Sequence, residues 1–263
     1  MPFLPGLEFA QTHLAVAYRG APEPQLLHVQ VRTAAPAETP FASAAIDAFV
    51  DLVAAGGAGG AEFPPSAGKA RIAAQPIDPL ATDRTWSLEV AGVSPRALRG
   101  LVESLRRAGS PHPVTSLSVL GERPTDGSPL SVRDDVLGGW LERPDVYPER
   151  WAQVPFGVNL EDAARGARVR AAVRGGTNPA LLEDFEALMM LWTVSILDYP
   201  DHLREKRGTI DRDPRIGRTR GELSVNFARF DYEAAPAWAL LSNLLVGFHE
   251  RVAPLIEVDV ALA

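Results

Sequence analysis

The feature that most constrains the fold is a strand–helix–strand pattern at the end of the chain. Residues 222–230 alternate apolar and polar side chains, as a strand with one buried face does. A helix that opens at Pro236 follows, and residues 255–262 alternate again. The helix carries an apolar stripe of Trp238, Leu241, Leu244, Leu245 and Phe248. A helix between two half-buried strands indicates an α+β layer in which the helix covers one face of a sheet.

The first half of the chain repeats this pattern. Strands are predicted at 85–90 and 114–120, on either side of a helix that begins at Ser94 and Pro95. Further upstream, strands at 7–18 and 25–33 precede a helix with Thr39 as N-cap and Pro40 in its first turn. In the second half, strands at 156–160 and 167–174 precede a helix that begins at Asn178 and Pro179. Counted from the two prolines, apolar residues share their offsets: Ile46 with Phe185, Phe49 with Leu188, Val50 with Met189, and Val53 with Trp192.

Each half therefore reads β-β-α-β-α-β. The predicted fold class is α+β, with tandem duplicated units that each form a ferredoxin-like two-layer sandwich, helices on one face of a mostly antiparallel sheet. We expect a first repeat at 1–123, a connecting segment at 124–150 and a second repeat at 151–263. Residues 56–80 read as a long Gly- and Pro-rich loop with room for a short strand at 70–74. The alternative is that two unrelated amphipathic halves resemble each other at this level.

Composition narrows the class of protein. The net charge of −7 argues against nucleic acid as a partner, because nucleic-acid binders need an excess of Lys and Arg. The chain has no cysteine, which excludes disulfides and cysteine-based metal or catalytic sites. It also has no signal peptide and no apolar run long enough to cross a membrane, so we expect a soluble, cytoplasmic protein. Abundant Ala, Gly and Pro, with more Arg than Lys, are typical of a GC-rich bacterial genome.

A search for chemistry-bearing motifs predicts no catalytic residue, no metal site and no cofactor. The five histidines are scattered without helical spacing, and no serine sits in a nucleophile elbow. Gly175 and Gly176 lie between a strand and a helix, where they could bind an anion, but such a turn needs glycine in any case.

One charged segment stands out. Residues 201–220 form a long connection that is poor in apolar side chains, and long connections are often functional. With two arginines of the preceding strand, it predicts a binding surface made of Arg168, Arg170, Arg204, Arg207, Arg212, Arg215, Arg218 and Arg220. Arginine suits bidentate contact with carboxylate or phosphate. The alternative is a solvated loop with internal ion pairs.

Two functions follow from these observations. The first is a non-catalytic protein that acts through a protein partner with an acidic or phosphate-bearing surface, either a toxin-neutralising immunity protein or a subunit of a larger assembly. Aromatic residues near the connecting segment (Trp140, Tyr147, Trp151) would anchor that interface. The alternative is an enzyme or RNA-processing factor with a cleft between two ferredoxin-like repeats, for which His28 or His249 would supply the chemistry.

Overall fold

The computed structural model describes residues 13–18, 21–38, 40–57, 63–93, 98, 101–102, 104–105, 114–122, 151–162, 166–197, 214–230 and 235–262. Within it the chain forms two compact units. The first consists of Met1–Val50 and Lys69–Arg143, and the second of Asp51–Gly68 and Pro144–Ala263. The predicted connecting segment, 124–150, lies outside the described residues.

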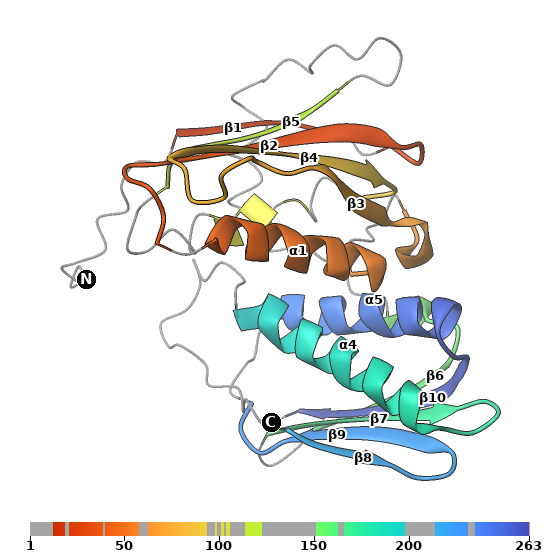
Figure 1. Ribbon diagram of the computed structural model, residues 1–263. Coiled ribbons are helices and arrows are strands. Elements are labelled where there is room, and N and C mark those ends of the chain that lie inside the picture. The colour runs from red at the N-terminus through yellow and green to blue at the C-terminus, as the bar shows by residue number, and fades with distance from the viewer. Residues whose placement is uncertain are drawn as a thin grey trace, which may run out of the picture. The chain divides into compact units, whose positions relative to one another are not determined.

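The first unit is built on a five-stranded sheet with strand order β1-β5-β2-β4-β3. Its elements are β1 (His13–Ala17), β2 (Gln25–Thr33), α1 (Phe41–Ala54), β3 (Lys69–Ala74), β4 (Asp83–Ala91) and β5 (Val114–Gly121). All neighbouring strands are antiparallel except β1, which lies parallel to β5. Helix α1 lies along one face of this sheet (Figure 1). The predicted second helix is present in its described part, where Leu98, Leu101, Val102 and Leu105 are helical and buried.

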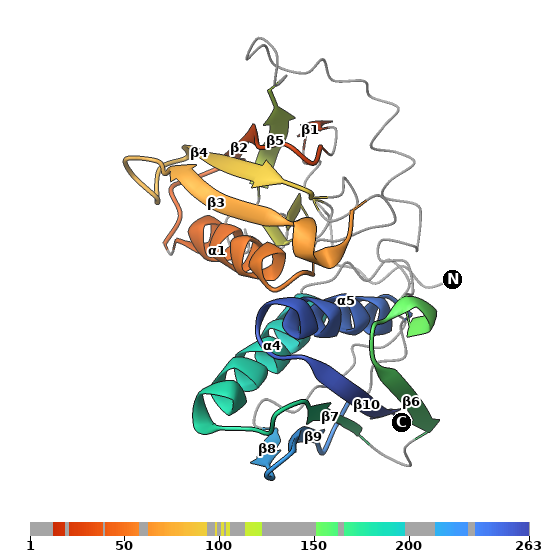
Figure 2. The same ribbon diagram turned by 90° about the vertical axis from the view of Figure 1, so that its right-hand side faces the viewer.

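The second unit repeats this topology. Its strand order is β6-β10-β7-β9-β8, again with one parallel pair, β6 with β10. The elements are β6 (Gly157–Asp162), β7 (Ala167–Val173), α4 (Pro179–Leu197), β8 (Arg215–Arg218), β9 (Glu222–Phe227), α5 (Ala235–Arg251) and β10 (Leu255–Leu262). Both helices lie on one face of the sheet (Figures 1 and 2). Short 3-10 turns occur at η1 (Pro65–Ala67) and η2 (Trp151–Gln153).

The predicted fold class is confirmed. In each unit the four antiparallel strands and two helices follow the β-α-β-β-α-β order of a ferredoxin-like fold. A further strand (β1 or β6) precedes them and pairs with the last strand. Each unit has one strand that the β-β-α-β-α-β pattern does not include. The first is β3, expected only as a short strand at 70–74, and the second is β8, which falls inside the segment predicted to be a loop.

The core of the second unit lies between its sheet and its helices. Alternate residues of β7 are fully or nearly fully buried, as a strand with one covered face requires. Trp192 of α4 is fully buried, stacks on Phe230 with ring centroids 5.0 Å apart and meets Phe227 edge-on. Trp192 is thus a core residue of the second unit. The side chain of Trp238 lies outside the described residues.

Helix ends follow the predicted capping signals. At α4, the backbone N–H of Leu181 donates to Asn178 Oδ1 at 2.9 Å, so Asn178 is the N-cap. At the end of α1, Gly56 has a φ of +93°, and Gly56 and Gly57 donate to the carbonyls of Val53 and Leu52. This is a Schellman motif, which needs a residue with positive φ and therefore favours glycine at position 56.

The segment Asp51–Gly68 packs on α5 within the second unit. Leu52 belongs to the same apolar core as the second sheet. Arg251, at the end of α5, donates through its guanidinium to the carbonyls of Val53, Ala54, Pro65 and Gly68. These carbonyls include two at the C-terminal end of α1, where acceptors lack partners inside the helix. Across the described residues, none of the helices is long and apolar enough to span a membrane.

Candidate functional site: the polar faces of the two sheets

Each sheet has one face against helices and a second face, here called its polar face. On the second sheet, strand register places the polar-face residues in rows across the strands. One row joins Arg215 of β8, Asn226 of β9 and Arg168 of β7. The next row joins Gly217, Ser224 and Arg170. Three of the predicted binding residues therefore come together on this face, from two segments far apart in the sequence.

These three arginines differ in how they are paired. Arg168 donates to Glu161 at 3.2 Å, in an ion pair that remains partly exposed. Within the part of the chain that the structure describes, neither Arg170 nor Arg215 has an ion-pair or hydrogen-bond partner for its guanidinium. Guanidinium groups without a carboxylate partner keep their donors available for an anionic ligand. We name Arg168, Arg170 and Arg215 the arginine group.

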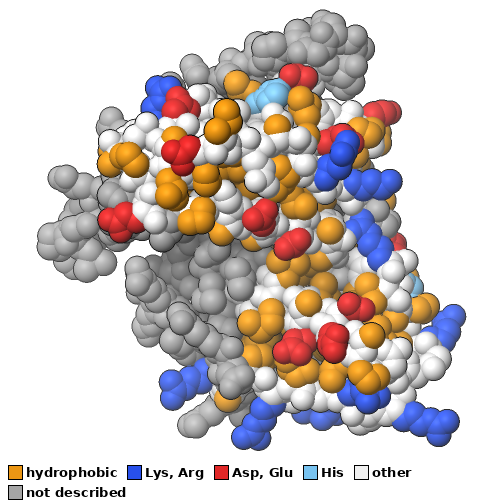
Figure 3. Space-filling view, viewed as in Figure 1, with side chains coloured by type: hydrophobic (Ala, Val, Ile, Leu, Met, Phe, Trp, Pro, Cys, Tyr) orange, Lys and Arg blue, Asp and Glu red, His pale blue; other side chains and the backbone are white. Residues whose placement is uncertain are grey.

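The same face is acidic on its other side. Continuing the two rows across β10 and β6 brings in Asp259 and Glu161, and Glu257 lies in the next row, opposite Ala172. Asn159 donates to Glu257 and Asp259 at 2.7 and 2.8 Å and holds these two carboxylates together. On this face the arginines thus lie on β7 and β8, whereas the carboxylates lie on β10, on β6 and, at Glu222, on β9. In the space-filling view, Lys and Arg side chains gather along the part of the second unit where its sheet lies, while Asp and Glu side chains lie over α4 (Figure 3).

The other predicted binding residues do not join this group. Arg218 is on the opposite side of β8 from Arg215, because it pairs with buried Leu223, and its Nη1 donates to the carbonyl of Thr177 at 3.3 Å. Arg220 lies in the β8–β9 turn, where its carbonyl accepts from the N–H of Thr177. Arg204, Arg207 and Arg212 lie outside the described residues. The Gly175–Gly176 turn needs glycine for its backbone, since both residues have positive φ.

The polar face of the first sheet carries a histidine cluster. His28 of β2 contacts Ser87 of β4 (Nδ1 to Oγ, 3.0 Å) and Glu122, just after β5 (Nε2 to Oε1, 2.7 Å). The side chains of His28 and Glu122 are 34% and 30% exposed, so the cluster is half-buried yet reachable from solvent. The sequence indicated His28 only as a residue that would supply the chemistry of the alternative function, and it indicated neither of these two contacts. His249, named with it, accepts the backbone N–H of Leu255 at 3.0 Å and packs beside Phe156, which is a structural role.

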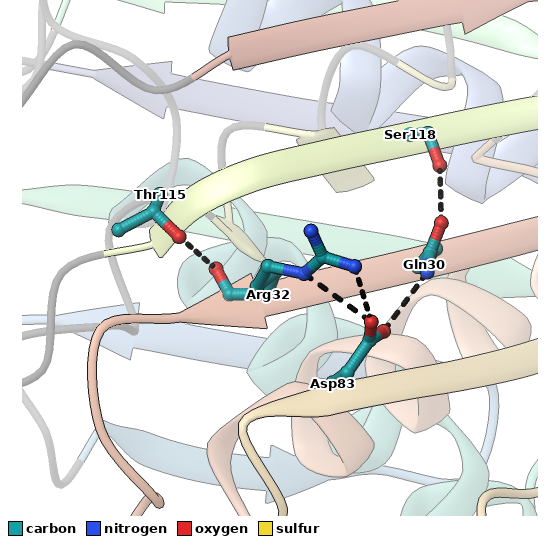
Figure 4. A network of polar contacts seen from close by, with 5 residues as sticks. All are labelled: Gln30, Arg32, Asp83, Thr115 and Ser118. Carbon is teal, nitrogen blue, oxygen red and sulfur yellow. Dashed lines mark hydrogen bonds and ion pairs between the residues drawn. The ribbon is translucent and has the colours of Figure 1, made fainter.

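Next to this cluster lies a network of paired polar side chains (Figure 4). Asp83 accepts from Arg32 at 2.6 and 3.2 Å and from Gln30 at 2.9 Å, and Gln30 in turn accepts from Ser118. The hydrogen bonds from Arg32 and then from Gln30 hold the pKa of the Asp83 carboxyl below its usual value. A second arginine of this face, Arg71, is paired with Glu89. The arginines of this face that the structure describes are therefore neutralised, unlike the arginine group.

Comparisons with known proteins give one structural neighbour to report. No family model matches the chain, and no curated protein matches it. Among solved structures, the chain is similar to a Cas6 product complex, at 15% identity and a TM-score of 0.20, over 85% of this chain and 91% of that chain. At this identity and TM-score, the alignment assigns no residue of this chain a role.

The comparison corrects two expectations. The prediction of a non-catalytic protein that acts through a protein partner is wrong, and so is the expectation that nucleic acid is an unlikely partner. The finding that stands against both expectations is the Cas6 product complex among the solved structures. The error has a physical reason. A net charge of −7 is a sum over the whole chain, whereas a ligand meets the local charge of one face.

Proposed function

We propose that this protein is an RNA-processing factor that holds RNA by its phosphate backbone across the β7–β8 side of the second sheet's polar face. The observation that carries the proposal is the arginine group: two of its three guanidinium groups are unpaired among the described residues. Arginine forks contact phosphate through two donors at once, which fixes orientation as well as charge.

The spacing of the arginine group suits one nucleic-acid strand. Arg168 and Arg170 are two residues apart on β7, so their backbones are about 7 Å apart, and Arg215 is two strands away, at about 10 Å. Asn226 and Ser224 lie between the arginines and offer hydrogen bonds to sugar or base. The carboxylates on β10 and β6 repel phosphate, and so does Glu222 at the start of β9, which favours the rows of Arg168 and Arg170 for an RNA strand.

The salt dependence of RNA binding tests this proposal. The probe is a fluorescein-labelled, single-stranded RNA oligonucleotide of mixed sequence, titrated at several salt concentrations. For single strands, each phosphate contact contributes about −0.7 to the slope of log K against log salt, so three contacts contribute about −2. We expect Arg168→Gln/Arg170→Gln/Arg215→Gln to weaken binding at low salt and to flatten the slope by about 2, with the melting temperature unchanged.

A matched variant controls for total charge. Arg71→Gln/Arg174→Gln/Arg229→Gln removes three exposed arginines outside the arginine group and should keep the wild-type slope. The same oligonucleotide made as DNA separates recognition of RNA from attraction to backbone charge alone. Wild-type protein that does not bind the RNA at low salt, or equal slopes for the two triple variants, would exclude this surface.

A further inference from the structure

The histidine cluster on the first sheet has the connectivity of a nucleophilic relay. Glu122 is a carboxylate and can only accept, so His28 Nε2 carries a proton and donates it across the 2.7 Å contact. In the neutral imidazole, Nδ1 is then an acceptor, and the hydroxyl of Ser87 donates to it at 3.0 Å. A serine hydroxyl that donates to a histidine oriented by a carboxylate is the arrangement that activates serine as a nucleophile.

The charge and polarity of the side chains around the histidine cluster indicate which substrates could bind there. Arg32 and Arg71 are tied to Asp83 and Glu89, so the described part of this face offers no unpaired guanidinium for a phosphate. Glu122 would in addition repel an anionic substrate. Leu120, the register partner of His28 on β5, and Leu26 on β2 flank the cluster with half-buried apolar side chains. A neutral, partly apolar substrate fits these conditions, and a phosphodiester does not.

The strand beside Ser87 is irregular. Register shifts between Ile72 and Ala74 of β3, so that Ala74 pairs with Ser87 and Ala73 has no register partner on β4. A β-bulge of this kind takes backbone groups out of the ladder, and bulges are over-represented next to active sites. Free backbone N–H groups are what acyl-transfer sites use to stabilise an oxyanion. The irregularity therefore lies beside the one serine whose hydroxyl contacts His28.

We propose that Ser87, His28 and Glu122 form an acyl-transfer site for neutral carboxylic esters. The Ser87 oxygen bonds to the ester carbonyl carbon as its proton passes to His28 Nδ1. The bond to the leaving alcohol then breaks, and this alcohol takes the proton from His28. Water next attacks the acyl-Ser87 carbonyl, its proton passes through His28 to Ser87, and a carboxylic acid leaves. The net reaction is ester plus water to acid plus alcohol.

Two readouts test the site on the full chain. A fluorophosphonate probe should label the folded protein, and mass spectrometry should find the adduct on Ser87. With p-nitrophenyl butyrate, we expect release of p-nitrophenol that falls to the uncatalysed rate in Ser87→Ala, at least 10-fold in His28→Gln, and by a smaller factor in Glu122→Gln. Loss of only the relay's orienting group leaves nucleophile and base in place, which is why the last effect is smaller.

Ser118→Ala is the matched control, since Ser118 lies on the same face but bonds Gln30 instead of a histidine. It should keep both labelling and turnover, and thermal unfolding should show that all four variants remain folded. Absence of an adduct on Ser87 of the wild type, or equal turnover in wild type and Ser87→Ala, overturns the proposal. The site shares no residue with the arginine group, so neither result changes the expected RNA binding, and failure of RNA binding leaves this test intact.

Discussion

At the scale of single residues, the sheet face that a side chain occupies depends on its position in the strand, because successive side chains point to opposite faces. Arg215 and Arg218 both belong to β8, three positions apart, and therefore lie on opposite faces of the second sheet. Arg215 shares its row with Arg168, while Arg218 bonds a carbonyl beside the start of α4. Residues 201–220 were predicted to contribute one binding surface. In the structure, Arg215 belongs to that surface and Arg218 does not.

Asp83 gives a prediction of pH dependence at this scale. Its hydrogen bonds with Arg32 and Gln30 lower its pKa in the folded protein relative to the unfolded chain. The stabilisation by the carboxylate is therefore complete above the unfolded pKa of about 3.9 and is lost as the pH falls through the lower, folded value. We expect the melting temperature of the wild type to exceed that of Asp83→Asn at pH 7, and this difference to shrink steadily between about pH 5 and pH 2.

The pair is exposed, so the difference will be small and will decrease with salt. Arg32→Gln removes the first cause of the shift and serves as the control. In that background, Asp83→Asn should have less effect at every pH. A difference between wild type and Asp83→Asn that grows as the solution becomes more acidic would contradict this assignment.

At the scale of elements, the helices could be predicted and the short edge strands could not. Helices α1 and α4 are indicated by apolar residues at helical spacing and by proline in or just before the first turn. Their predicted stripes are buried, except for Val50 of α1, which is half-buried. Strand β8 has only four residues, Arg-Ile-Gly-Arg, of which two are charged and one is glycine. Short, charged edge strands resist pairing with other chains, but for the same reason they lack the alternation that identifies a strand.

At the scale of elements, we predict the effect on stability of replacing Gly247 of α5 with alanine. A Cβ at Gly247 would lie 2.1 Å from the carbonyl oxygen of Ala55 and 3.1 Å from the Cα of Gly56, both of them backbone atoms. Alanine would ordinarily stabilise a helix by about 1 kcal/mol relative to glycine. Here the clash must separate α5 from the segment after α1, so we expect Gly247→Ala to be destabilising by about 1–3 kcal/mol.

Urea unfolding of the full chain measures this change. Gly221→Ala is the matched control, because nothing lies within 4 Å of the position that its Cβ would take. That substitution should change stability by less than about 0.5 kcal/mol. Equal unfolding midpoints for Gly247→Ala and the wild type would show that α5 does not make this close approach.

At the scale of the whole molecule, the second unit is discontinuous in sequence. It takes Asp51–Gly68 from the first half of the chain, and this segment covers α5 through Leu52 and through the carbonyls bound by Arg251. A fragment of residues 144–263 would expose the apolar side chain of Leu240 and leave the Arg251 guanidinium without these acceptors. We expect this fragment to have a lower melting temperature in isolation, and a synthetic peptide of residues 51–68 to raise it.

A scrambled peptide of the same composition controls for non-specific binding. If the fragment melts at the same temperature with either peptide and without them, Asp51–Gly68 contributes nothing to the second unit. That outcome would also place the boundary of the second repeat where the sequence alone put it, at residue 151.

The candidate sites could be foreseen only in part. Arg168 and Arg170 stood out because their spacing of two puts them on one face of a strand, which is a local signal. The contact of His28 with Glu122 joins residues 94 positions apart, and that with Ser87 joins residues 59 apart. No local pattern brings these three together. Their meeting depends on the order β5-β2-β4, which follows from pairing of the whole sheet.

The parallel strand at the edge of each sheet has a consequence for the order of folding. β1 is made before the other strands of its sheet, but its partner is β5, the last strand of the same sheet to be made. During synthesis β1 must wait while β2, α1, β3 and β4 emerge. Contacts between distant parts of a chain form slowly, since a large loop must close before they are gained. We therefore expect β1 to dock on its sheet after the antiparallel strands have paired, and the pairing of β6 with β10 leads to the same expectation for the second unit.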